Sequence, residues 1–156
     1  MEKETAERLA VIRRFEAAGF RAWPATSVQY DGTWAVRLTG SHPALRLNSI
    51  NPLDPGDDHR LKERVEQAER RFQAYGRPLT FRISPLAAPA ISEYLDARGW
   101  STLKESRVMR LRLTGDIVGK AMHQIPLKDL NRFVTAAFQV HGYDAELRPG
   151  FTEVVS

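Results

Sequence analysis

The 156-residue chain contains no cysteine, which excludes disulfide bonds and thiolate-bound metals and favours the cytoplasm as its compartment. It also lacks an apolar run close to the roughly 20 residues that cross a bilayer. The N-terminus, Met-Glu-Lys-Glu, has no apolar stretch typical of a signal peptide. These absences predict a cytoplasmic protein that has no membrane attachment.

Charge of one sign is not in large excess. The chain has 23 lysines and arginines against 19 acidic residues, a mixture that favours a solubilising surface over a nucleic-acid interface. At 42% hydrophobic residues, a chain of this length can bury roughly two-thirds of its unfolded surface in a core. We therefore expect a globular protein whose partners are not nucleic acids.

The first half of the chain reads as one helix and three strands. Apolar residues recur at helical spacing over residues 4–18, and Gly19 offers a helix end. Strand patterns follow over residues 21–30, 34–39 and 45–50, with Asp31-Gly32 as a tight hairpin signal between the first two. The expected arrangement is a three-stranded antiparallel meander.

Helices and strands alternate in the second half. Asp54 and Pro55 are typical of a helix start, and Gly76 and Pro78 of its end. A strand is expected over residues 79–83, a helix from Ser84-Pro85 to residue 98, and a strand over residues 103–113, where Leu103, Met109, Leu111 and Leu113 share one face. The predicted fold class is α/β (α+β), a mixed, mainly antiparallel sheet flanked by helices in the order αβββαβαβ.

A polar stretch separates this module from the C-terminal residues. We expect a module over residues 1–114, a linker over 115–125, and a helix with a tail over 126–156. The predicted helix carries Leu130, Phe133, Val134 and Phe138 at three- and four-residue spacing, so it needs a partner surface. A second module or a second copy of the chain, bound through residues 127–141, would supply one.

Several short runs resemble the GNAT superfamily of acyl-CoA-dependent N-acetyltransferases. The runs are Phe20-Arg-Ala-Trp-Pro24, Asp31-Gly-Thr-Trp34, Val36-Arg-Leu38, Leu47-Asn-Ser-Ile-Asn-Pro-Leu53 and Tyr94-Leu-Asp-Ala-Arg-Gly-Trp100. Their order is similar to that in the N-terminal half of two-module GNAT proteins. The resemblance covers about residues 4–113 and implies transfer of an acetyl group from acetyl-CoA to an amine.

In that family, the loop from the fourth strand to the third helix carries glycines whose amides approach the pyrophosphate of acetyl-CoA. The equivalent residues here, 48–58, contain a single glycine, Gly56, together with Asp54, Asp57 and Asp58. Carboxylates at a helix start compete for the amides and repel a pyrophosphate. The resemblance therefore implies a non-catalytic N-terminal module that does not hold acetyl-CoA in the usual way, with residues 126–156 beginning a second module.

Two other functions stay open at this point. A complete small acetyltransferase would use Tyr94 as the general acid, although the family's tyrosine position, four residues before Gly99, falls on Leu95. A non-enzymatic module would instead dimerise through the 127–141 helix. We expect no metal, because helix capping accounts for the Asp57-Asp58-His59 run better than a metal site does.

A ligand or substrate surface is the remaining hypothesis. Arginines alternate along the predicted strands and would form a basic face if they lay together, or separate solvated side chains if they did not. Three polar residues beside the expected helix start have no capping role. The predicted surface comprises Arg37, Arg46, Asn48, Ser49 and Asn51.

Overall fold

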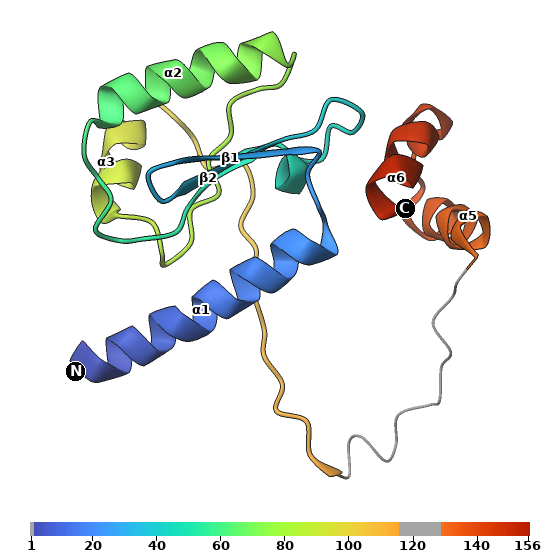
Figure 1. Cartoon of the computed structure of the whole chain (residues 1–156), viewed down its shortest axis with the longest axis horizontal. Helices are drawn as coiled ribbons and strands as arrows, with labels where there is room; N and C mark the ends of the chain where they lie inside the picture. Colours follow the sequence, from blue (N-terminus) through green and yellow to red (C-terminus); the bar gives the residue numbers. More distant parts are fainter. Residues whose placement is uncertain (1, 116–128) are drawn as a thin grey trace.

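The computed structural model describes residues 2–115 and 129–156 and is shown in Figure 1. It has the expected mixture of helices and strands, with three strands in one antiparallel sheet: β1 (Ser27–Asp31), β2 (Trp34–Leu38) and β3 (Ser49–Pro52). The central strand β2 pairs Val36 with Gln29 of β1 and with Ile50 of β3. The three-stranded meander predicted from the sequence is thus confirmed.

The described helices are α1 (Glu2–Ala22), α2 (Leu61–Ala74), α3 (Pro89–Ala97), α5 (Leu130–His141) and α6 (Arg148–Val155), with short 3-10 turns at Leu45–Leu47 and Ala145–Leu147. In Figure 1, α2 and α3 lie together near the sheet and α1 runs past it on another side. None of the described helices is long and apolar enough to cross a membrane.

The main core lies where β2 and β3 meet α2 and α3. On one face of the sheet, alternating residues are completely or almost completely buried, as expected for a strand with one covered face. They pack against Val65 and Phe72 of α2 and against Ile91 and Leu95 of α3. The sheet side of this core consists of Trp34, Val36, Leu38 and Ile50.

The predicted strand over residues 79–83 is reduced to a single parallel bridge between Phe81 and Ile50. Ile50 donates its amide to the Thr80 carbonyl and accepts from the Arg82 amide, each at 2.8 Å. The Phe81 ring meets Trp34 and Trp100 edge-on, with centroids 5.5 and 5.8 Å apart. The segment therefore closes the core beside β3 although it makes only one pair with that strand.

Four predicted boundaries over residues 1–61 are wrong. The strand expected over residues 21–30 begins at Ser27, because α1 occupies the chain as far as Ala22. The first helix continues through Gly19 to Ala22, and the third strand begins at Ser49 because a 3-10 turn occupies Leu45–Leu47. The helix expected at Asp54 begins at Leu61, after Arg60 with a φ of 52°. The carboxylate of Asp54 accepts from the Gly56 amide at 2.9 Å instead, so it closes a local turn.

The helix expected from Ser84-Pro85 begins at Pro89. The Ser84 hydroxyl accepts from the Leu86 amide, and the Ala87 amide donates to the Ser84 carbonyl at 2.9 Å. Ser84 and Pro85 therefore form a turn, and the favourable first helical position for proline is taken by Pro89.

The predicted strand over residues 103–113 is also wrong, because no described strand pairs with it and residues 101–114 form neither helix nor strand. Its large apolar side chains are exposed. The alternation of apolar and charged residues is present, but a strand also needs a neighbour that accepts its backbone hydrogen bonds.

Helices α5 and α6 pack together and contact the loop after β2. A Cβ atom on Gly150 of α6 would lie 1.8 Å from the Ser41 carbonyl oxygen, so no other residue fits there without a backbone shift. The Phe151 ring packs edge-on against the rings of Trp23 and Phe138.

The linker residues 116–125 and residues 126–128 of the predicted helix lie outside the described residues, and the domain division stays a prediction.

Candidate functional site

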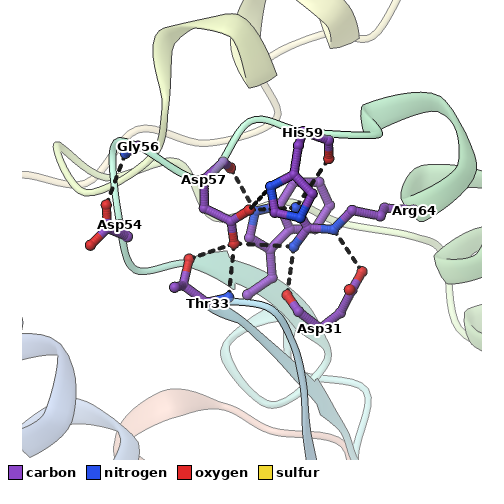
Figure 2. Close-up of polar contacts among 8 residues, drawn as sticks. Asp31, Thr33, Asp54, Gly56, Asp57, His59 and Arg64 are labelled. Atoms are coloured by element: carbon purple, nitrogen blue, oxygen red, sulfur yellow. Dashed lines mark hydrogen bonds and ion pairs between the residues drawn. The ribbon is translucent and has the colours of Figure 1, made fainter.

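The loop between β3 and α2, residues 53–60, brings a buried carboxylate into the polar network of Figure 2. Asp57 is 7% exposed, and its Oδ2 accepts from the amide and hydroxyl of Thr33 at 2.8 and 2.7 Å. Its Oδ1 accepts from Nη1 of Arg64 at 2.7 Å. The loop is therefore fastened to the β1–β2 hairpin and to α2 by one side chain.

Arg64 lies on α2 and binds both the β1–β2 hairpin and the loop. Its Nε donates to Oδ2 of Asp31 at 2.9 Å, and its guanidinium carbon lies 3.8 Å from the ring centroid of Trp34. Burial opposes the charge, but the hydrogen bonds from Arg64 to Asp57 and Asp31 outweigh it and raise the pKa of Arg64. We call Asp31, Thr33, Asp57, His59 and Arg64 the Asp57–Arg64 network.

The hairpin turn allows this packing because it contains glycine. Gly32 has a φ of +57°, and a Cβ atom there would lie 2.7 Å from Oδ2 of Asp57. Any side chain would collide with the buried carboxylate while adopting a strained backbone conformation. The Asp31-Gly32-Thr33 sequence therefore turns the chain and also makes room for Asp57.

The network holds Asp57 ionised. Burial alone would raise the pKa of this carboxyl, but hydrogen bonds from Arg64 and Thr33, together with the charge of Arg64, lower the pKa from its ordinary 3.8 to about 2. A fixed negative charge in this position repels anionic groups that approach the loop. The nearby charge of Arg64 is already committed to two carboxylates, Asp31 and Asp57.

Like Thr33, His59 is an exposed member of the network. Its Nδ1 lies 3.0 Å from Oδ1 of Asp57, and its side chain is 67% exposed. Among the residues that the structure describes, no group of three acidic, histidine or cysteine side chains could hold a metal ion.

Two backbone amides at the centre of the loop are occupied. The Gly56 amide donates to Oδ1 of Asp54 at 2.9 Å and the Asp57 amide to the Asp54 carbonyl at 3.2 Å. Asp54 also forms an exposed ion pair with Arg13 of α1. A pyrophosphate cradle needs such amides unpaired, so these two amides, beside the ionised Asp57, do not fit the phosphates of acetyl-CoA.

The predicted polar surface is mostly enclosed. Arg37, Asn48, Ser49 and Asn51 are each 2% exposed or less, and only Arg46 is exposed, with its guanidinium carbon 5.3 Å from the Trp23 ring centroid. These five residues therefore form no open surface in this conformation. A role for any of them in ligand binding stays a prediction.

Hydrogen bonds to the backbone account for much of this enclosure. Asn48 accepts from the Thr39 amide at 2.8 Å and donates to the carbonyls of His42 and Ala44, which fastens the loop after β2. Asn51 donates to the carbonyl and hydroxyl oxygens of Ser49. Asn48 therefore holds the loop after β2, and the Asn51 side chain is fixed beside Ser49 within β3.

The arginines do not gather on one face. Arg37 donates to the carbonyls of Arg46, Phe20 and Trp23, and burial, followed by the charge of Arg82, lowers its pKa. Arg82 pairs with Glu16 of α1. Arg110 and Arg112 lie in the exposed stretch after Trp100, away from any strand.

Tyr94 lies on α3 and packs its ring partly against the core. Its hydroxyl accepts from Nη1 of Arg98 at 3.1 Å. Among the described residues, its printed polar and ring contacts include none of the five predicted surface residues. A catalytic role for Tyr94 stays a prediction.

Sequence reasoning missed the Asp57–Arg64 network. One signal was available, since Arg64 falls on the same helical face as Leu61, Val65 and Ala68, where an arginine is expected only with an acidic partner. The Asp31-Gly32-Thr33 turn was recognised as a hairpin. Nothing in its sequence indicated that it would receive Asp57 from 24 residues further on.

Comparisons of the chain with models of protein families, with curated proteins and with solved structures find no match. The resemblance to the GNAT superfamily therefore rests on the residues of the chain alone.

Proposed function

We propose that this chain is a GNAT-like module that supports an N-acetyltransferase without binding acetyl-CoA itself, as the non-catalytic N-terminal half of such an enzyme. The order of the meander, α2 and the parallel bridge at Phe81 supports this proposal, as do the family-like runs in the sequence. The observation that carries it is the occupied loop: Asp54 takes the Gly56 amide where the resemblance puts the pyrophosphate.

A titration of the chain with acetyl-CoA in a calorimeter tests the proposal. We expect no binding in the micromolar range, because a phosphate would have to displace Asp54 and approach the ionised Asp57. Micromolar binding by the unmodified chain would overturn it.

A pair of variants tests whether the occupied Gly56 amide is the reason that acetyl-CoA does not bind. Asp54→Ala frees the Gly56 amide, whereas Asp58→Ala removes the same charge and leaves that amide occupied. We expect any gain in affinity for acetyl-CoA to be larger in Asp54→Ala. Equal gains would show that charge alone, and not amide occupancy, excludes the cofactor.

The supporting role needs a catalytic half. The coding sequence beyond Ser156 is expected to contain Arg or Gln, two further residues, Gly, one residue, then Gly or Ala, the motif that holds acetyl-CoA in the family. A coding sequence without that motif counts against the two-module arrangement, whatever the calorimetry shows.

The alternative of a complete small acetyltransferase depends on Tyr94. The observation in its favour is that the hydroxyl lies at the rim of the core, held by the cationic Arg98. Acetyl transfer by this chain to any member of a broad panel of amines, with loss of activity in Tyr94→Phe, would favour it. Absence of transfer across the panel would reject it.

A further inference from the structure

The stretch from Ser101 to Thr114, which we call the extended segment, has the composition of a strand and no strand to pair with. Its exposed apolar side chains retain between 65% and 85% of their accessible surface. Its backbone groups make no hydrogen bond to other described residues. The exposed side chains are Leu103, Val108, Met109, Leu111 and Leu113.

The same chain also has an open sheet edge. Residues 79–83 pair with β3 through the Thr80 carbonyl and the Arg82 amide. Because backbone groups alternate in direction along a strand, the amide and carbonyl of Phe81 point to the opposite side. Neither makes a backbone hydrogen bond within the described part of the chain, and an unpaired edge of this kind is a template for another strand.

The extended segment does not fill this edge in its own chain. It leaves the core at Trp100, whose ring lies 5.8 Å from that of Phe81, and runs away from the sheet past α1 (Figure 1). There Arg110 helps to line a hollow with Phe15 and Ala18 of α1. Each copy of the chain therefore offers one unpaired strand and one vacant edge.

We propose that two copies of this chain exchange extended segments, each adding a strand to the open edge beside Phe81 of the other. The exchange is reciprocal, so the same two surfaces are used twice and the assembly closes as a symmetric dimer. The odd-numbered apolar residues of the segment then lie with Phe81 and Trp100 and extend the core. The even-numbered residues, which include Arg110 and Arg112, lie on the other face.

The apolar area is of the size that a stable dimer needs. At about 60–120 Å² of apolar surface per large side chain, the four odd-numbered residues, which are 67% to 85% exposed, present roughly 160–400 Å² in each copy. Two segments and the surfaces that receive them would bury about 640–1,600 Å², which overlaps the range of specific interfaces.

Analytical ultracentrifugation of the 156-residue chain tests the proposal, together with amide hydrogen exchange at low and high protein concentration. We expect a dimer in which the amides of residues 103–113 are protected, and the protection should fall as dilution dissociates the dimer. Leu111→Asp should weaken dimerisation by more than about tenfold, because it places a charge on the face that becomes buried. Arg112→Asp adds the same carboxylate to the opposite face and should leave the dimer largely intact.

Each other outcome overturns the exchange. A monomer at every concentration rejects it, and so does a dimer that Leu111→Asp does not weaken or whose segment amides are unprotected. A monomer with protected segment amides would mean that the segment pairs with the edge of its own chain. Because the Leu111 side chain is 69% exposed, Leu111→Asp should fold normally, which a circular dichroism melt of the same sample checks.

Discussion

Strand β2 and the extended segment share a sequence pattern and have different surroundings. Both alternate around a row of large apolar residues, yet β2 is buried along its whole length and the extended segment is exposed. Strand β2 has neighbours on both sides, whereas the segment has none among the described residues. The pattern therefore specifies which face a strand would bury, and the neighbours decide whether it becomes a strand.

The two regions also treat charge differently. Arg64, beside the buried end of β2, has two carboxylate partners and lies on Trp34. Arg110 and Arg112 make no ion pair within the described part of the chain. Charged side chains thus take part in the packing beside the sheet, whereas those of the segment lie on the surface. This difference predicts which substitutions will lower the free energy of unfolding.

The largest effect is expected at Arg64. Arg64→Met keeps much of the apolar stem and leaves Asp57 buried without its cation, so we expect a loss of about 3–5 kcal/mol in the free energy of unfolding. Urea denaturation followed by circular dichroism measures it. Arg70→Met, on the exposed face of the same helix, is the control and should change stability by less than about 0.5 kcal/mol.

A loss below about 1 kcal/mol in Arg64→Met would contradict the structural role of the network. The double variant Arg64→Met with Asp57→Asn supplies a further check, since removing both charges should recover part of the loss. Without such recovery, lost packing on Trp34 rather than the unpaired carboxylate would explain the single variant.

A smaller effect is expected on acidification. Because the pKa of Asp57 is lower in the folded chain, about 2 against an ordinary 3.8, its ionisation stabilises the fold above pH 4, and this contribution is lost as the pH falls from about 4 through 2. The shift corresponds to about 2.5 kcal/mol. Unfolding free energies of the natural chain and of Asp57→Asn, measured from pH 6 to pH 2, should converge at the acidic end by about that amount. A constant difference would contradict the lowered pKa.

The meander could be predicted from sequence because its information is local. Asp31-Gly32 specifies a tight turn, and the alternation around Trp34, Val36 and Leu38 specifies the buried face.

Helices α2 and α3 are predictable for the same reason, but the residues at which they start are not. At Asp54 and Ser84, the side chain was assigned to a helix cap, while each closes its own short turn. A cap and a turn use the same residue types, so sequence alone did not separate them.

The candidate site was not predictable in the same way. The Asp57–Arg64 network joins residues up to 33 positions apart, and no local rule relates a hairpin turn to a helix that begins 29 residues later. Helix capping does not explain the polar residues Asn48, Ser49 and Asn51. Their burial depends on how the sheet is covered, which is a tertiary property.

The strand prediction for residues 103–113 is wrong for a related reason, since the sequence pattern contains no information about a neighbouring strand.

The smallest and most direct comparison uses one substitution in both regions. Val36 of β2 is 5% exposed and Val108 of the extended segment is 65% exposed. Val36→Ala removes two buried methyl groups and leaves a cavity, so we expect a loss of about 2 kcal/mol. Val108→Ala should lower the free energy of unfolding by less than about 0.5 kcal/mol in dilute solution, because most of the side chain is already exposed to solvent in the folded chain. Denaturation at low protein concentration measures both. Val108 lies on the same face of the extended segment as Arg110 and Arg112, so Val108→Ala should stay neutral at high protein concentration, whereas Leu111→Ala, on the face that the dimer buries, should be neutral when dilute and become costly when concentrated. That result would mean that the segment is a strand that lacks only its neighbour. Equal costs for the two valines in dilute solution would instead mean that the segment is packed within a single chain, and the contrast between the two regions would disappear.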